Sequence, residues 1–248
     1  MESPSPLPSV VDCQPTNVNV LLSQLEGEYE ERLQKAGLEP ILLMDEKNPQ
    51  IEKIDFDVTG AGYNLCIVNT GGNHADLTPD YAAVPAEMKA VAAALGKSVL
   101  RETDEESVIA HIPELRKSVG DRAILRALHF FAENRRVAAQ KEALQKGDLP
   151  TFLSGVIASG RSSFCYLQNV YTTKNVAEQG LSLALCLAER YLSDKGGAFR
   201  VHGGGFAGTA QAFVPLDLLD TFKAGMEAIL GAGRCHVLSI RPEGGAVL

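Results

Sequence analysis

The feature that most constrains the fold is a run of helical patterns, residues 79–196, that separates one strand pattern from three others. A short buried-strand run, residues 63–70, comes before it. Two strand patterns, a helical pattern and a last strand pattern come after it. This order resembles a split β-α-β arrangement with extra helices inserted after the first strand. We therefore expect an α+β fold, a ferredoxin-like sheet covered by helices on one face.

Glycines mark the expected ends of several elements. Gly96, Gly120 and Gly147 each close a helical pattern, and the longest pattern, residues 121–147, has no interruption. An alternating run at residues 51–58 is typical of a further strand. The expected helices are residues 79–96, 104–120, 121–147, 149–168, 175–196 and 216–231, and the expected strands are residues 63–70, 198–203, 209–215 and 235–240.

The first fifty residues differ in character from the rest. The first sixteen are rich in Pro and Ser, and we expect them to be poorly ordered. Apolar residues at three- and four-residue steps predict one amphipathic helix at residues 17–36. A short strand is expected at Ile41 to Met44. The predicted organisation is a leader, residues 1–50, followed by one domain, residues 51–248.

Composition limits the class of protein and its partners. The chain has 248 residues and a formal net charge of −8, which argues against nucleic acid or an anionic membrane surface as the main partner. No apolar run approaches the roughly 18 residues of a membrane helix. The start has no basic residue before its apolar part, unlike a secretion signal. Five scattered cysteines without a C-x-x-C pair indicate reduced thiols, so we expect a cytoplasmic protein without a metal site.

The glycine-rich stretch FRVHGGGFAGTAQAFVP, residues 199–215, lies between two strand patterns. A Walker phosphate loop needs a lysine after its last glycine, and none follows Gly208. A dinucleotide-binding loop leads from a strand into a helix, whereas this one leads into a second strand. Its glycines allow close approach of another backbone or of a ligand. From composition alone, a plain hairpin corner and a ligand-facing loop are both open.

Four stretches in the same order resemble galactokinases, members of the GHMP small-molecule kinase family. The stretch RVHGGGFAGTAQAFVP is similar to their C-terminal glycine motif. The other three are residues 65–96, with a His-containing loop followed by a tyrosine, residues 121–137 and residues 153–175. The resemblance covers about residues 51–248.

The resemblance implies a two-part enzyme that phosphorylates galactose with ATP. Its N-terminal half would hold the phosphates on a glycine- and serine-rich loop and would supply an acidic residue and an arginine. Its C-terminal half would close over the site. No G-L-x-S-S-[SA] loop occurs in these 248 residues, and residues 1–50 do not resemble the N-terminal half. We therefore expect the C-terminal half alone, with no catalytic residue, inactive by itself, and with ATP and Mg²⁺ bound only if another half completes it.

The resemblance also assigns site residues. It implies that Tyr81 contacts galactose, whereas its position is also typical of a half-buried tyrosine at a helix start. The segment AAVPAEM that follows departs from the Asn and paired arginines usual in the family, so it leaves the sugar contacts open. The glycine motif near the phosphate site consists of Gly203, Gly204, Gly205 and Gly208.

Three other polar residues share a turn, Asn73, His74 and Asp76. They offer too few ligands for a metal site, and His74 matches a family position that we expect to organise the loop. His202, beside the glycines, is expected to face the core or the solvent.

Two further groups favour structural roles. His129 and Glu133 lie four residues apart on one helical pattern, a spacing typical of a local ion pair. Arg161, Ser162 and Ser163 are expected to form a solvated turn.

Three classes of function remain. The first is a galactokinase part that acts on galactose or a related sugar together with an N-terminal half from another chain. The second is a non-catalytic sugar-binding or regulatory module derived from such a kinase. The third is an interaction protein, whose apolar surface is covered by residues 17–36 or by a second copy of the chain. None of the three involves nucleic acid or a membrane.

Overall fold

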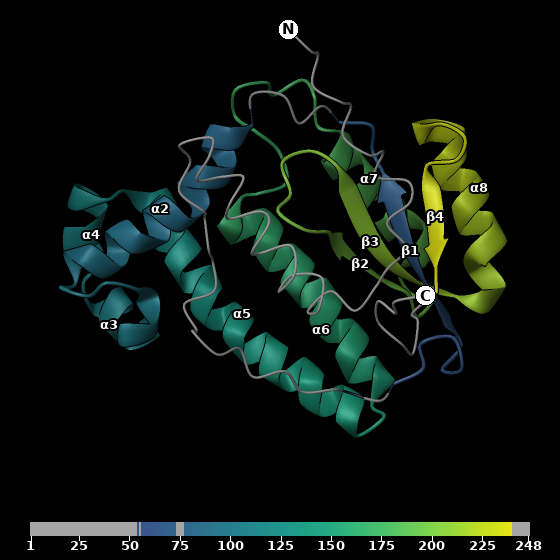
Figure 1. Cartoon of the computed structure of the whole chain (residues 1–248), viewed down its shortest axis with the longest axis horizontal. Helices are drawn as coiled ribbons and strands as arrows, with labels where there is room; N and C mark the ends of the chain where they lie inside the picture. The colour runs from purple at the N-terminus through teal and green to yellow at the C-terminus, as the bar shows by residue number, and fades with distance from the viewer. Residues whose placement is uncertain (1–53, 55, 73–76, 240–248) are drawn as a thin grey trace, which may run out of the picture. The chain divides into compact units, whose positions relative to one another are not determined.

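The computed structural model describes residues 54, 56–72 and 77–239, and Ile54–Leu238 form one compact unit (Figure 1). The strands in this part are β1 Tyr63–Asn69, β2 Ala198–Val201, β3 Thr209–Pro215 and β4 Cys235–Leu238. The helices are α2 Thr78–Ala94, α3 Glu105–Ala110, α4 Ile112–Ser118, α5 Asp121–Gln145, α6 Leu149–Ser162, α7 Gly180–Leu192 and α8 Leu219–Leu230.

The strands form one antiparallel sheet in the order β2-β3-β1-β4. β1 pairs with β3 along its whole length, from Tyr63 opposite Pro215 to Asn69 opposite Thr209. Since β1 precedes the run of helices and β3 follows it, this pairing brings together segments that are far apart in the sequence. The ends of β1 and β3 that carry Asn69 and Thr209 lie side by side, and the run of glycines 203–208 leads into β3 there.

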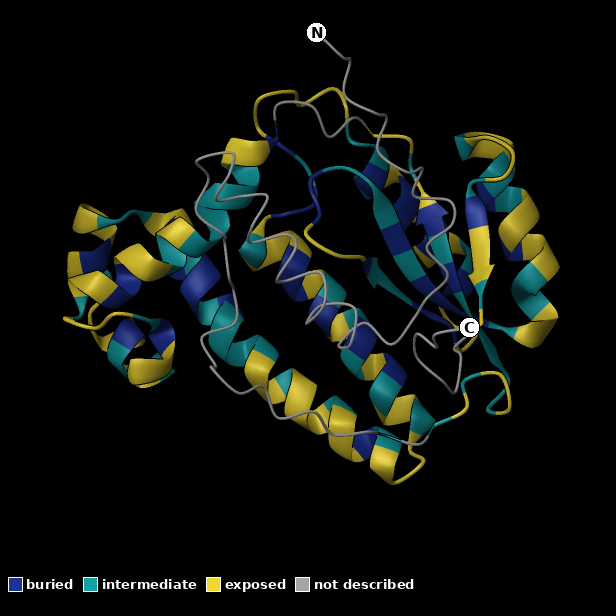
Figure 2. Cartoon of the chain, viewed as in Figure 1, coloured by how far each residue is buried: buried dark blue, intermediate teal, exposed yellow. Residues whose placement is uncertain are grey.

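Helices cover both faces of the sheet (Figures 1 and 2). α7 and α8 pack on one face, where Val214 and Phe222 are almost fully buried. Alternate strand residues point to the other face, where Phe213 packs against Leu153 of α6. The sequence predicted one covered face. The second is covered because Leu153 and Val156 form a buried stripe on α6.

A second group of helices packs separately. α2, α3, α4 and the first half of α5 surround an apolar cluster that includes Val91, Val108, Leu115 and Ala127, here named the helical cluster. Burial of a side chain such as Leu115 stabilises the fold by about 1.5–3 kcal/mol.

The α+β class with a small antiparallel sheet is confirmed. The finer assignment to a split β-α-β, ferredoxin-like sheet stays a prediction, as does the domain boundary near residue 50. The helix 17–36 and the strand Ile41 to Met44 lie outside the described residues.

Two predicted helices differ from the structure. Residues 104–120 form α3 and α4 instead of one helix, because Pro113 lacks the amide that a helix interior requires and stands in the first turn of α4. In residues 149–168, α6 ends at Ser162 and a π-helical turn, Ser163–Leu167, follows. In the alternating run 51–58, the residues that the structure describes lie in loop and turn and not in a strand.

No helix in the described part of the chain is long and apolar enough to cross a membrane. The four cysteines in that part are free thiols. Cys66 and Cys235 are buried, whereas Cys165 and Cys186 are exposed.

Candidate functional site

The glycine loop, residues 203–208, connects β2 to β3, so the predicted strand, turn and strand are formed. The segment after the π-helical turn supports it. The amide of Phe206 donates to the carbonyl oxygen of Asn169 at 2.5 Å, and Nδ2 of Asn169 donates to the carbonyl oxygen of Gly204 at 3.1 Å. Asn169 is itself almost fully buried. These bonds fix the backbone of the loop at Gly204 and at Phe206.

Tyr81 meets the same loop from the first turn of α2. Its hydroxyl donates to the carbonyl oxygen of Gly205 at 2.7 Å, and its ring lies edge-on to Phe206 with centroids 5.2 Å apart. A Cβ on Gly204 would lie 2.7 Å from that ring. Burial raises the pKa of the Tyr81 phenol, so the hydroxyl remains a donor at neutral pH. The structure thus joins the tyrosine and the glycine motif, although Tyr81 and Gly205 are 124 residues apart.

The turn at the end of β1 forms a third side of the site. Thr70 donates twice to the carbonyl oxygen of Gly208, from its amide at 2.9 Å and from Oγ1 at 2.8 Å. A Cβ on Gly72 would lie 3.1 Å from Cβ of Ala207, so the turn and the loop are in close contact. The candidates that follow this turn lie outside the described residues: Asn73, His74 and Asp76.

The irregular segment before α7 places a cation beside α2. Nζ of Lys174 lies 2.9 Å from Oδ2 of Asp80, the residue before Tyr81. The Lys174 side chain is 52% exposed, whereas Asp80 is mostly buried. Sequence reasoning missed Lys174 and Asn169, because a single Lys or Asn in an irregular segment carries neither a period nor a motif.

His202 stands at the end of β2, beside the first glycine of the loop. Its side chain is exposed, which is one of the two predicted orientations. Nδ1 lies 3.0 Å from Oγ1 of Thr209, so the ring bridges the base of the hairpin.

The glycine loop uses its acceptors within the protein and keeps some donors available. The carbonyl oxygens of Gly204, Gly205 and Gly208 all accept hydrogen bonds. Among the described residues, none accepts a hydrogen bond from the amides of Gly203 and Gly204. Amides of successive turn residues attract anions. These two amides can therefore donate to a phosphate or to a hydroxyl group.

In the described ranges, no three His, Cys, Asp or Glu side chains lie close enough to hold a metal ion. Asp80, the carboxylate next to Tyr81, is paired with Lys174.

His129 and Glu133 do not form the predicted local pair. Nδ1 of His129 lies 2.9 Å from Oγ of Ser162, whereas Glu133 accepts from Nε of Arg136 at 2.7 Å and from the hydroxyl of Ser159. Burial lowers the pKa of His129, so its ring is neutral at pH 7. The group joins α5 to α6 and includes no residue of the glycine loop.

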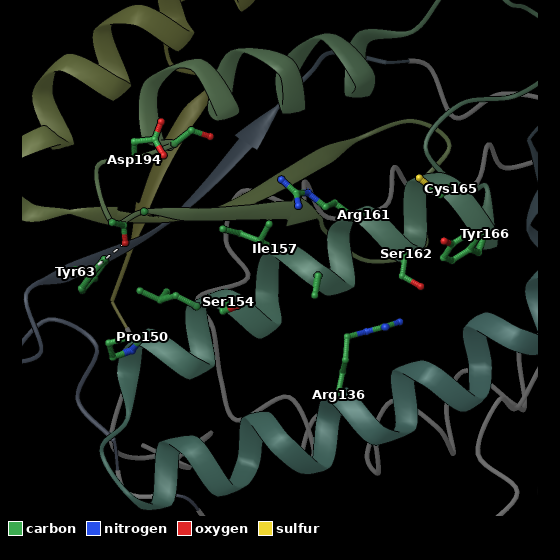
Figure 3. Close-up of a pocket in the computed structure, with 15 residues that line it drawn as sticks. Tyr63, Arg136, Pro150, Ser154, Ile157, Arg161, Ser162, Cys165, Tyr166 and Asp194 are labelled. Atoms are coloured by element: carbon green, nitrogen blue, oxygen red, sulfur yellow. Dashed lines mark hydrogen bonds between the residues drawn. The ribbon is translucent and has the colours of Figure 1, made fainter.

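A groove of about 890 Å³ runs along α6 (Figure 3). Tyr63, Arg136 and Arg161 are among the residues that line it. Arg161, Ser162 and Ser163 do not form the predicted solvated turn. They lie where α6 passes into the π-helical turn, and both serines are buried. The groove contains neither Tyr81 nor a loop glycine, so it is separate from the candidate site.

Curated proteins with similar sequences are galactokinases. Over 157 residues, 62% of this chain, the sequence is 29% identical to the galactokinase of Actinobacillus pleuropneumoniae serotype 5b (strain L20) and covers 38% of it. Over 162 residues, 65% of this chain, it is 28% identical to the galactokinase of Glaesserella parasuis serovar 5 and covers 40% of it. Over 210 residues it is 28% identical to the galactokinase of Streptomyces coelicolor and covers 51% of that protein. The chain thus spans between two fifths and half of these relatives. No protein family model matches it.

A solved structure has the same fold. Lactococcus lactis galactokinase, in complex with galactose, matches 80% of this chain and 49% of its own with a TM-score of 0.61. The sequences are 22% identical, so this likeness establishes the fold alone. Together the comparisons confirm the predicted resemblance to galactokinases over part of their length.

Proposed function

We propose that this chain forms the C-terminal wall of a galactokinase-type sugar site, and that a phosphate-binding half supplied by another stretch of polypeptide completes it. One observation carries the proposal, the contact between Tyr81 and the carbonyl oxygen of Gly205 at 2.7 Å. By resemblance, Tyr81 contacts the sugar, and the glycine motif lies near the phosphates. A kinase must hold these two groups next to each other, because phosphoryl transfer depends on positioning.

The residues of the wall have separate roles in this proposal. Tyr81 bounds the sugar, galactose or a related one. The amides of Gly203 and Gly204 face the transferred phosphate. ATP and Mg²⁺ are held by the completing half, because no G-L-x-S-S-[SA] loop occurs in the 248 residues. The chain then supplies no acid or base and has no activity of its own. Like the galactokinases it resembles, it would work in the cytoplasm.

Calorimetry with galactose tests this proposal. The chain is mixed with the N-terminal half of a galactokinase, and galactose is titrated into the mixture and into each component alone. We expect tighter binding by the mixture than by either component. Tyr81→Phe should remove that gain, and Tyr166→Phe, at an exposed tyrosine, should preserve it. Equal binding with and without this chain would refute the proposal.

A second candidate function is sugar binding without catalysis. It is favoured by the same contact, because Tyr81 and the glycine loop meet within this chain without help from another. In that case galactose binds to the chain alone, Tyr81→Phe weakens the binding, and no added half produces turnover.

A further inference from the structure

Among the described residues, the largest side chain that is almost fully buried is a charged one, Arg126 of α5, with 2% of its surface exposed. Burial lowers the pKa of its guanidinium, which shows that its surroundings disfavour the charge. A buried charge is tolerated only where it is paired and hydrogen-bonded. The partners of Arg126 therefore indicate what it holds together.

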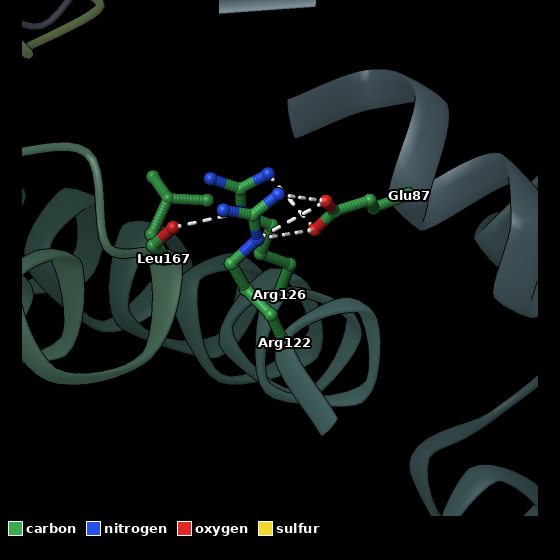
Figure 4. A network of polar contacts seen from close by, with 4 residues as sticks. All are labelled: Glu87, Arg122, Arg126 and Leu167. Atoms are coloured by element: carbon green, nitrogen blue, oxygen red, sulfur yellow. Dashed lines mark hydrogen bonds and ion pairs between the residues drawn. The ribbon is translucent and has the colours of Figure 1, made fainter. Parts of the chain in front are cut away.

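Arg126 bonds to two elements at once (Figure 4). Nη1 donates to Oε2 of Glu87 in α2 at 2.9 Å, and Nε donates to the carbonyl oxygen of Leu167 at 2.9 Å. Arg122, one turn earlier on α5, binds the same carboxylate. Glu87 is thus held by two guanidinium groups, and one of these also reaches the end of the π-helical turn.

Both elements support the glycine loop. α2 carries Tyr81, which donates to the carbonyl oxygen of Gly205. Leu167 precedes, by two residues, Asn169, which bonds to the loop at Gly204 and Phe206. Arg126 therefore connects the two segments that bond to the loop.

Among the described residues, the other polar links between α2 and these segments are weaker or belong to the site itself. The Asp80–Lys174 pair has a half-exposed lysine, and such pairs contribute little. The Tyr81 hydroxyl bond is part of the site. The apolar residues Met88 and Val91 of α2 belong to the helical cluster, whereas Val170, which follows Asn169, belongs to the cluster under α7 and α8. A buried, charge-assisted link is the strong one in this set.

We propose that Arg126 is a positioning residue. By joining Glu87 to the Leu167 carbonyl, it sets the separation between Tyr81 and the Asn169 segment, and so the geometry of the glycine loop. Its effect on sugar binding rests on the proposed function, whereas its effect on Tyr81 does not. A lysine cannot replace it, because a single ammonium lacks the fork that reaches both partners.

The test compares three variants. Arg126→Met removes both bonds with little change in volume. Arg126→Lys retains the charge beside Glu87 and gives up the second bond. Arg135→Met is the matched control, because Arg135 lies on the same helix and forms an ion pair with Glu105, but is 62% exposed. The readout is the pKa of the Tyr81 phenol, which is measured by an NMR titration of chains with ¹³C-labelled tyrosine rings. The Tyr81 signal is assigned by its absence from Tyr81→Phe.

In both Arg126 variants we expect the Tyr81 pKa to fall toward its ordinary value of 10.0, because the ring is no longer held in its buried place. In the completed mixture, galactose affinity should fall between about tenfold and a hundredfold, as expected for a small misplacement of a binding group. Arg135→Met should change neither quantity.

An unchanged Tyr81 pKa in Arg126→Lys, together with a lower unfolding midpoint, would show that Arg126 only stabilises the core and would overturn the proposal. If Arg126→Met does not fold, Arg126→Lys decides alone. If no mixture binds galactose, the proposed function fails, but the Tyr81 titration still decides the role of Arg126.

Discussion

Two glycines of the same loop should respond very differently to the same substitution. Gly203 and Gly205 both have positive φ, +66° and +84°. A Cβ on Gly203 would have nothing within 4 Å, whereas a Cβ on Gly205 would lie 1.9 Å from the carbonyl oxygen of Asn169. The pair therefore separates backbone strain from steric conflict.

The expected losses follow from these surroundings. Gly203→Ala carries only left-handed strain and should lower the free energy of unfolding by about 1 kcal/mol. Gly205→Ala adds overpacking and displaces the Asn169 oxygen from the Phe206 amide, so its loss should be about 4 kcal/mol. The difference corresponds to more than about a hundredfold in the unfolding constant.

Urea unfolding followed by circular dichroism measures both variants against the native chain. The m value should stay the same, so that the shift in midpoint reports stability alone. Galactose binding by the completed mixture should survive Gly203→Ala and be lost in Gly205→Ala. Equal stability losses in the two variants would refute the contact between Gly205 and Asn169 on which this reasoning depends.

Three other predictions concern single side chains. Tyr81→Phe should lower the free energy of unfolding by about 0.5–1.5 kcal/mol in a urea titration, because the Gly205 carbonyl loses one of its two donors and keeps only the Ala207 amide; an unchanged midpoint contradicts this. The pKa of His129 lies below its ordinary 6.5, so the stability it contributes is present above pH 6.5 and is lost as the pH falls below it. His129→Gln should therefore reduce the change of the unfolding midpoint with pH below pH 6.5. An equally steep dependence on pH in the variant would count against burial of the ring. Cys165 and Cys186 should react with a thiol reagent in the folded chain, whereas Cys66, buried and with a raised pKa, should react only on unfolding; mass mapping of modified peptides distinguishes the two classes.

Much of the fold was predictable because its signals are local. β1, β3 and α5 lie within a residue or two of their predicted bounds, since alternation and helical spacing are properties of the segment itself. Pro113 could have been used to divide residues 104–120, because its effect on a helix is also local. The π-helical turn Ser163–Leu167 gave no comparable warning, since the helical spacing continues through it.

The site was predictable only in part. Tyr81 and the glycine motif came from the resemblance, and neither pattern by itself required them to meet. No pattern in the sequence distinguishes Arg126, because its partners Glu87 and Leu167 lie 39 and 41 residues away in the chain. Residues whose role depends on such contacts cannot be found from spacing along one segment.

The proposed function divides a phosphoryl-transfer site between this chain and another half. The most direct test measures galactose-dependent ADP formation by the chain alone, by the N-terminal half of a galactokinase alone, and by their mixture. We expect turnover in the mixture only, and its loss in the mixture that carries Gly205→Ala. Turnover by the chain alone, or its absence from every mixture that binds galactose, would contradict the account.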